Sequence, residues 1–402
     1  MFTIQIANLV NIMYFSLEYT TWQVVAASVS LVMVLTALLI FIRRVWPLKV
    51  KASEDASELR DDPERMLPAA VIVYSKDEAG DLARLIPELM EQQYEPGFDV
   101  IVVNEGHSPA VVELINDLKL QHPNLYLTGT PDGARSLSRK KLAITLGIKA
   151  TRKPVVILTT AEARPSGPNW LHAMMRNFDP DGPVEVVLGY ATPPAGDPAG
   201  SSTRWFDIVA VASRWISPAI LGHPWRGTEH NLAYRTDVFF RNKGFSKHLN
   251  LRHGDDDIFV SEIAKPYNTV VDLSPEARVY VPGGCDRRTV RGNAIRRAFT
   301  ERFIKHRPRL MGSIGTLAYM LAPLCAIAVG GVAPQNWGAW ALTAILLVVW
   351  YATGLIWLPA FKALDARRPG ATLPLAAATY PLRQFYRRAM AIMRHGKRYT
   401  WE

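Results

Sequence analysis

The stretch WQVVAASVSLVMVLTALLIFI, from Trp22 to Ile42, carries no charged side chain over 21 residues. At about 1.5 Å per residue, a helix of this length spans the roughly 30 Å hydrocarbon core of a bilayer. Four basic residues follow it between Arg43 and Lys51, and none precedes it. A cleaved signal peptide has a basic start and a small-residue cleavage site, so the stretch predicts an uncleaved anchor with the following chain in the cytoplasm.

A second apolar zone, residues 311–361, breaks at VAPQNW into two uncharged segments. Basic residues flank both outer sides and the connecting loop has none, which predicts a transmembrane hairpin with both ends in the cytoplasm. Buried helices of a soluble protein are the alternative, which the lengths and flanks disfavour. The expected organisation is 1–51, a segment with a transmembrane helix at about 22–42; 52–67, a linker; 68–310, a cytoplasmic domain with a basic juxtamembrane helix; 311–361, the hairpin; and 362–402, a basic amphipathic tail on the membrane.

The net charge of +10 is concentrated beside this second zone. Nine Lys and Arg residues stand against two acids between Asp286 and Arg309. The stretch is short, juxtamembrane and poor in aromatic residues, which favours membrane lipids or a phosphorylated substrate as partners over nucleic acid. Charge that only sets the topology is the alternative. Cys285 and Cys325 are the only cysteines, and the second lies in a predicted span, so a structural disulfide or a thiolate zinc site is disfavoured.

Between the anchor and the hairpin, strand and helix patterns alternate. Apolar strand patterns occur at AAVIVYS, FDVIVVNE, NLYLTGT and VVILTT, with helical patterns over DLARLIPELMEQ, PAVVELINDLKL and LSRKKLAITLGIKA. This alternation predicts an α/β fold with a mostly parallel sheet and helices on both faces. In such sheets ligands bind beyond the carboxyl ends of the strands. The acids at those ends are Asp77, Glu78, Glu105 and Glu162.

Two common nucleotide-binding motifs are missing at these strand ends. No G-x-G-x-x-G follows the first strand and no Walker sequence is present, which disfavours a dinucleotide-binding dehydrogenase and a P-loop ATPase. The order of other motifs resembles a membrane-bound bacterial family 2 glycosyltransferase with the GT-A nucleotide-diphospho-sugar transferase fold. The similar motifs are VIVYSKDEAGDL, DVIVVNEGHS, SRKKLAITLGIKA, LTTAEARP in place of the family's TDADxxP metal motif, and residues 227–260, which end in GDDDIFV.

The resemblance implies roles for individual residues. Asp256 is the first candidate for the catalytic base and Asp255 the second, and Glu162 is the acid that would hold a divalent cation, Mn or Mg. Residues implied on the nucleotide-sugar side are Asp77, Glu78, Glu105, Lys140, Lys141, Thr160 and Arg164. Simpler readings stay open: the three aspartates could cap a helix, Glu162 could be a solvated loop residue and Arg164 could cap its own loop. Lys140 and Lys141 point about 100° apart on a helix, so at most one faces the site.

Three positions depart from the family pattern. Thr160 replaces an aspartate of the metal motif, Gly106 replaces an acid, and Asn293 and Ala294 stand where relatives have a Gln-Lys pair. A threonine hydroxyl is a much weaker cation ligand than a carboxylate. The resemblance therefore implies an inverting glycosyltransferase of the bacterial cytoplasmic membrane, acting between a nucleotide-sugar donor and a lipid-linked or membrane-associated glycan acceptor. The alternative is a catalytically degenerate binding or scaffold subunit of a surface-polysaccharide assembly.

Overall fold

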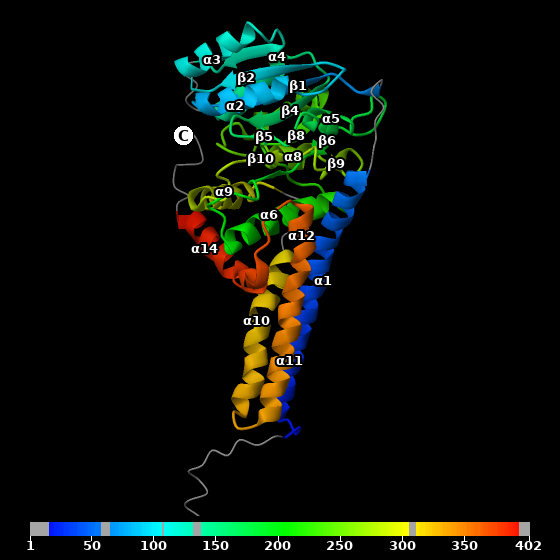
Figure 1. Cartoon of the computed structure of the whole chain (residues 1–402), viewed down its shortest axis with the longest axis vertical. Coiled ribbons are helices and arrows are strands. Elements are labelled where there is room, and N and C mark those ends of the chain that lie inside the picture. Colours follow the sequence, from blue (N-terminus) through cyan, green and yellow to red (C-terminus); the bar gives the residue numbers. More distant parts are fainter. Residues whose placement is uncertain (1–15, 58–64, 107, 132–137, 305–310, 394–402) are drawn as a thin grey trace, which may run out of the picture.

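An α/β domain stands on a bundle of long apolar helices in this computed structural model (Figure 1). The structure describes residues 16–57, 65–106, 108–131, 138–304 and 311–393. The parts of the expected linker at 58–64 and of the expected tail at 394–402 lie outside the described residues.

A seven-stranded sheet forms the centre of the α/β domain, in the order β3-β2-β1-β4-β8-β6-β9. Strands β1 to β4 are mutually parallel, whereas β8 runs antiparallel to both β4 and β6. The strands are β1 Ala69–Ser75, β2 Phe98–Asn104, β3 Leu125–Gly129, β4 Val155–Thr160, β6 Val186–Leu188, β8 Leu232–Arg235 and β9 Thr269–Val271. A second, three-stranded sheet pairs β5 Arg164–Pro165, β10 Val279–Tyr280 and β7 Ala191–Thr192. The predicted mostly parallel sheet is confirmed.

Helices cover both faces of the large sheet, which is why its parallel strands are apolar on both sides. Val71 and Val73 of β1 pack in one core cluster with residues of α2, α3 and α5, and Ala70 and Ile72 pack in the other with residues of α4, α6 and α8. The helices are α2 Ala79–Met90, α3 Pro109–Lys119, α4 Arg139–Ala150, α5 Trp170–Met175, α6 Ser202–Ile220, α7 Thr236–Arg241 and α8 Ile258–Ile263.

Among the described residues, three helices are long and apolar enough to cross a membrane: α1 (Thr21–Ser57), α10 (Met311–Val332) and α11 (Trp337–Gly354), the last continuing as an apolar helical segment to Ala363. Two buried polar side chains of α1 are bonded within the bundle: Ser30 Oγ donates to the Ala322 carbonyl at 3.0 Å and Gln23 Nε2 to the Val329 carbonyl at 3.1 Å. Such internal bonds are needed because a bilayer core offers no water to polar groups.

Helix α1 is longer than the sequence predicted. It continues to Ser57, so the first six positions of the expected 52–67 linker are helical. Asp55 explains the extension: it pairs with Lys51 one turn earlier at 2.6 Å and accepts a hydrogen bond from the Leu273 N–H at 2.8 Å. The end of the anchor helix is thereby attached to the α/β domain.

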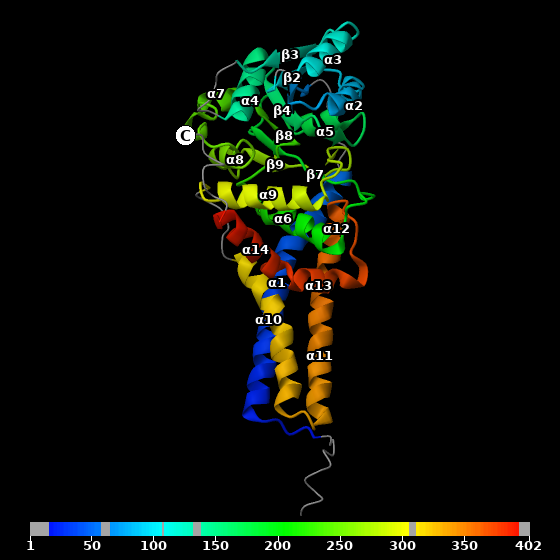
Figure 2. The same cartoon turned by 90° about the vertical axis from the view of Figure 1, so that its left-hand side faces the viewer.

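A layer of helices lies between the large sheet and the bundle (Figure 2). It contains α6, α9 (Arg287–Thr300), α12 (Leu358–Ala363), α13 (Leu373–Ala378) and α14 (Tyr380–Met393). Arg383 and Arg387 of α14 form ion pairs with the buried Asp207 of α6. Four apolar side chains of α14 remain exposed: Leu382, Phe385, Tyr386 and Met393.

Candidate active site

Strands β1, β2 and β4 end together, as parallel pairing requires. Tyr74 is in register with Thr160, and Ser75 with Asn104. The phenol of Tyr74 donates a hydrogen bond to Glu105, while the Lys140 ammonium lies 5.3 Å from the centre of the Tyr74 ring. Burial and the negative charge of Glu105 raise the pKa of Tyr74, which keeps the phenol protonated as a donor. The predicted polar edge therefore exists and is internally bonded.

The turn after β1 is tightly held and explains why position 106 is a glycine. The Glu78 carboxylate accepts hydrogen bonds from the Lys76 N–H at 2.6 Å and the Ser75 hydroxyl at 2.9 Å. A side chain at Gly106 would overlap the Asp77 carboxylate and come within 2.6 Å of the Lys76 carbonyl. Position 106 thus requires glycine, because the turn after β2 lies close to the turn after β1 and leaves no room for a side chain.

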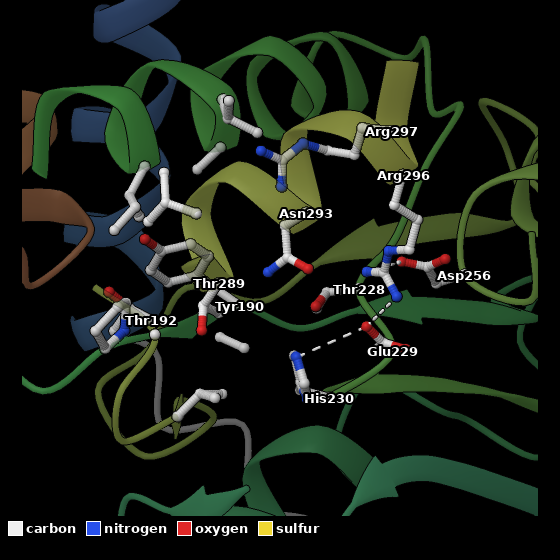
Figure 3. A pocket seen from close by; sticks show the side chains of 18 of the residues that line it. Tyr190, Thr192, Thr228, Glu229, His230, Asp256, Thr289, Asn293, Arg296 and Arg297 are labelled. Atoms are coloured by element: carbon white, nitrogen blue, oxygen red, sulfur yellow. Dashed lines mark ion pairs between the residues drawn. The ribbon is translucent and has the colours of Figure 1, made fainter. Parts of the chain in front are cut away.

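A pocket of about 390 Å³ opens beside this edge, between the large sheet and the helical layer. Figure 3 shows charged side chains converging on it from α9, from the loop before β8 and from the loop before α8. The polar residues that line it are Glu162, Tyr190, Thr192, Asp207, Arg226, Thr228, Glu229, His230, Asp256, Thr289, Asn293, Arg296 and Arg297.

Buried ion pairs fix one wall of the pocket. Lys140 lies 2.8 Å from Asp255 and also pairs with Glu229, which in turn pairs with Arg296. Although burial favours a neutral carboxyl, Arg296 and Lys140 hold the pKa of Glu229 well below its usual range. Glu229 is therefore ionised and forms ion pairs with both Lys140 and Arg296.

The three consecutive aspartates have three different roles. Asp255 pairs with Lys140, and Asp257 accepts hydrogen bonds from the Ile258 N–H at 2.7 Å and from the Thr300 hydroxyl, capping α8. Of the two predicted base candidates, only Asp256 lines the pocket. Burial and the charge of Asp257 raise the pKa of Asp256 to about 7, even though Arg226 and Arg296 each approach its carboxylate to 3.8 Å. A buried carboxyl that titrates near neutrality can accept a proton from a hydroxyl.

Thr160 and Glu162 lie around His230, a residue that sequence reasoning missed. The Thr160 hydroxyl is 2.8 Å from His230 Nδ1, and the Glu162 carboxylate is 3.8 Å from the same nitrogen. Burial lowers the pKa of His230 to about 4, so the ring is neutral. Partial desolvation, with the charges of Glu229 and Glu78, raises the pKa of Glu162, whose side chain is 55% exposed.

The described part of the chain does not fit a resident metal ion. No group of three or more His, Cys, Asp or Glu side chains in that part is arranged to hold one. Glu229, the nearest further acid, is already paired with Lys140 and Arg296. Glu162, the predicted metal ligand, thus reaches the pocket without a set of protein co-ligands.

Two basic residues that were predicted to contact the nucleotide-sugar, Lys141 and Arg164, are instead hydrogen-bonded to the protein itself. Lys141 is fully buried and donates to the carbonyls of His248 at 2.7 Å and Leu251 at 3.0 Å, and burial lowers the pKa of Lys141 to about 8. Only Lys140 of the pair faces the acids, as the helical spacing requires. Arg164 donates to the Ala161 and Ala163 carbonyls at 2.8 and 2.6 Å and pairs with Asp81 at 3.0 Å, so it holds its own loop.

Glu229 and His230 reach the site because β8 is antiparallel. Leu158 of β4 pairs with Leu232 of β8, so the residues that precede β8 lie beside those that follow β4. The signal in the sequence is TEH directly before the strand pattern NLAYR. This signal could place Glu229 and His230 in the site only once the antiparallel direction of β8 was known.

No family model matches the chain, and no curated protein matches it in sequence. Among solved structures, mannosyltransferase PcManGT from Pyrobaculum calidifontis, in complex with GDP-Man and Mn²⁺, is similar at 18% identity and a TM-score of 0.49, over 87% of this chain and 99% of that one. TarS from S. aureus matches at 15% identity and 0.39, over 80% and 93% of the two chains. Mannosyl-3-phosphoglycerate synthase from Rubrobacter xylanophilus matches at 13% and 0.38, over 63% and 77%.

Proposed function

We propose that this chain is an inverting GT-A glycosyltransferase that transfers a sugar from a nucleotide-sugar donor to a lipid-linked or membrane-associated glycan acceptor. Its α/β domain would lie on the cytoplasmic side of the bacterial inner membrane, with α1, α10 and α11 crossing the bilayer. The observation that carries the proposal is Asp256, a buried carboxyl with a pKa near 7 in a pocket above the apolar helices. The motif order of the sequence supports the same reaction.

In the proposed reaction Asp256 removes the proton of an acceptor hydroxyl as that oxygen attacks the anomeric carbon of the donor. The bond between this carbon and the diphosphate breaks on the opposite face, and the electron pair leaves with the diphosphate. A single displacement of this kind inverts the configuration and requires one base. Arg226 and Arg296 stand 3.8 Å from Asp256 and stabilise its carboxylate before the proton arrives.

Positive charge for the leaving group is available from the chain itself. Arg226, Arg296 and Arg297 line the pocket, and guanidinium groups pair well with phosphate oxygens. Because the described residues form no three-ligand metal set, we infer that Mn or Mg would enter with the diphosphate, with Glu162 as the contact from the protein. No step above depends on the ion.

The decisive experiment is Asp256→Asn in the full chain, reconstituted in nanodiscs with bacterial membrane lipids. Release of UDP or GDP from a panel of nucleotide sugars measures turnover. We expect the wild type to release nucleotide with at least one donor, and Asp256→Asn to lose turnover by at least about a hundredfold while retaining its melting temperature. Asp181→Asn, which removes a carboxylate that is 90% exposed, is the control. Full turnover in Asp256→Asn would exclude Asp256 as the base.

A second candidate function is a catalytically degenerate binding or scaffold subunit of a surface-polysaccharide assembly. It is favoured by the Thr160 hydroxyl, which already contacts His230, and by Glu162, which has no described partner ligands for a metal. Titration calorimetry with UDP- and GDP-sugars, with and without Mn²⁺, separates the two. Absence of binding under every condition would support the scaffold and contradict the transferase.

A further inference from the structure

A second cavity, of about 180 Å³, lies where the helical layer meets the apolar bundle; we name it the basal pocket. Residues of α1, α6, α10 and α14 line it, among them Arg44, Arg214, Leu317, Gln384, Phe385 and Arg388. Three arginines and no acid are among the described residues that line it. Within the described residues this pocket is therefore a concentration of positive charge at the edge of the bundle.

Several buried polar atoms around the basal pocket, including the Tyr380 hydroxyl, have no hydrogen-bond partner among the described residues. Arg44 Nη1 and Gln384 Nε2 are shielded from solvent and have no hydrogen-bond partner in the described structure. The same holds for Arg387 Nη1 and Trp225 Nε1 in a narrow adjoining cavity, which shares Arg214, Gln384 and Arg388 with the basal pocket. A buried donor left unpaired costs about 1–3 kcal/mol. Apart from the Tyr380 hydroxyl, which can donate or accept, these unpaired groups are donors, so an anion with several acceptor oxygens would satisfy them.

The narrow cavity shares lining residues with both the basal pocket and the active-site pocket. It shares Trp215, Arg226 and Arg297 with the active-site pocket, and its only acid is Glu301, 3.6 Å from Arg214. Burial and the neighbouring charges of Arg226 and Arg296 lower the pKa of Arg297 to about 9, as expected for a cation with too little negative charge around it. Arginines thus line each of three neighbouring cavities, from the basal pocket to the pocket of Asp256.

Apolar side chains stand at the outer side of the basal pocket. Leu317 of α10 and Phe385 of α14 line it and are 47% and 74% exposed. A soluble anion gains nothing from these side chains, whereas a lipid presents a phosphate to the arginines and a hydrocarbon chain to Leu317 and Phe385. Basic pockets between helices at a membrane boundary bind anionic head groups in this way.

We propose that the basal pocket binds the phosphate group of an anionic lipid, with Arg44, Arg214 and Arg388 holding the phosphate oxygens and Leu317 and Phe385 contacting the chain. The binding does not depend on the proposed function. Only the role of this lipid as the acceptor, or as the anchor of the acceptor, rests on that function; it is suggested by the arginines that line the cavities between the basal pocket and Asp256.

The test measures lipid retention by the full chain and does not use turnover. Protein is purified in detergent, exchanged into mixed phosphatidylglycerol and phosphatidylcholine, and analysed by native mass spectrometry. We expect one phosphatidylglycerol molecule to stay bound per chain of the wild type. The double variant Arg44→Gln, Arg388→Gln should retain at least about tenfold less of this lipid, because hydrogen bonds to charged groups contribute more binding free energy than bonds between neutral groups. Gln384→Glu, which keeps size and adds a negative charge, should lower retention as well.

Arg43→Gln is the matched control. It removes one positive charge, next to Arg44 on α1, from an exposed side chain that is not among the described residues lining the basal pocket. Equal retention in the Arg43 variant and in the double variant would overturn the proposal, as would equal binding of the two lipids. Displacement of the bound lipid by millimolar inorganic phosphate or pyrophosphate would assign the pocket to a soluble anion instead. Asp256→Asn should retain the lipid, so loss of transfer and loss of lipid binding are distinguishable.

Discussion

Replacing Lys140 by methionine tests the buried charge network behind the active site. The Lys140 side chain is 13% exposed and pairs with Asp255, which is 2% exposed, at 2.8 Å and also with Glu229. Glu229 keeps Arg296 in the variant, but Asp255 loses its cation, and Asp255 Oδ1 already has no hydrogen-bond partner among the described residues. Removing one partner of a buried ion pair costs about 3–5 kcal/mol. At about 2–4 °C per kcal/mol for a domain of this size, the melting temperature should fall by roughly 6–20 °C at pH 7.5.

The loss should depend on pH in a defined direction. Despite its burial, Lys140 holds the pKa of Asp255 below the ordinary value, so in the wild type this carboxylate stabilises the fold above the unfolded pKa and loses that effect as the pH falls. In the variant the pKa of Asp255 rises, because burial acts without the cation. At acidic pH, protonation of Asp255 then removes the unpaired buried charge and restores part of the stability of the variant. The difference in melting temperature between the two proteins should therefore shrink from pH 7.5 toward pH 4.5.

The measurement is thermal unfolding of both proteins in the same detergent at a series of pH values. A double variant, Lys140→Met with Asp255→Asn, is the control because it removes the stranded charge as well as the cation. It should recover part of the lost stability at pH 7.5. A loss that is constant between pH 4.5 and 7.5, or a double variant less stable than Lys140→Met, would refute the reasoning.

Three further predictions concern the pocket and its edge. Turnover should rise with pH through an apparent pKa near 7, because Asp256 must be ionised to act as a base; initial rates from pH 5.5 to 8.5 test this, and a flat profile contradicts it. Gly106→Ala should weaken nucleotide-sugar binding in calorimetry by at least about tenfold, since its methyl group would displace Asp77. Thr160→Asp should introduce Mn²⁺ binding, visible by electron paramagnetic resonance without nucleotide, because it adds a carboxylate beside His230 and Glu162; unchanged spectra would contradict this arrangement.

The parallel half of the sheet could be predicted from the sequence because its signals are local. Apolar strand patterns and helical spacing placed β1 to β4 and α2 to α4, and the shared direction of these strands placed Tyr74, Glu105 and Thr160 at one edge. The length of α1 was not predictable, because its last turns depend on the bond between Asp55 and the distant Leu273 N–H. A charged stretch without periodicity indicates a linker until such a partner is known.

The second half of the site depends on pairings that no local pattern contains. The order β4-β8-β6 brings TEH from residues 228–230 to the end of β4, and the loop before α8 then places Asp256 across the pocket. The His230 ring is hydrogen-bonded to the hydroxyl of Thr160. Thr160 is the position where the sequence departs from the metal motif of the glycosyltransferase family that it resembles. A neutral imidazole and a threonine hydroxyl form a hydrogen bond, whereas an aspartate there would bring a third carboxylate close to Glu162 and Glu229. Under the proposed function, Thr160 would limit the negative charge at the edge that accepts the diphosphate, while Arg226, Arg296 and Arg297 would provide positive charge beside it.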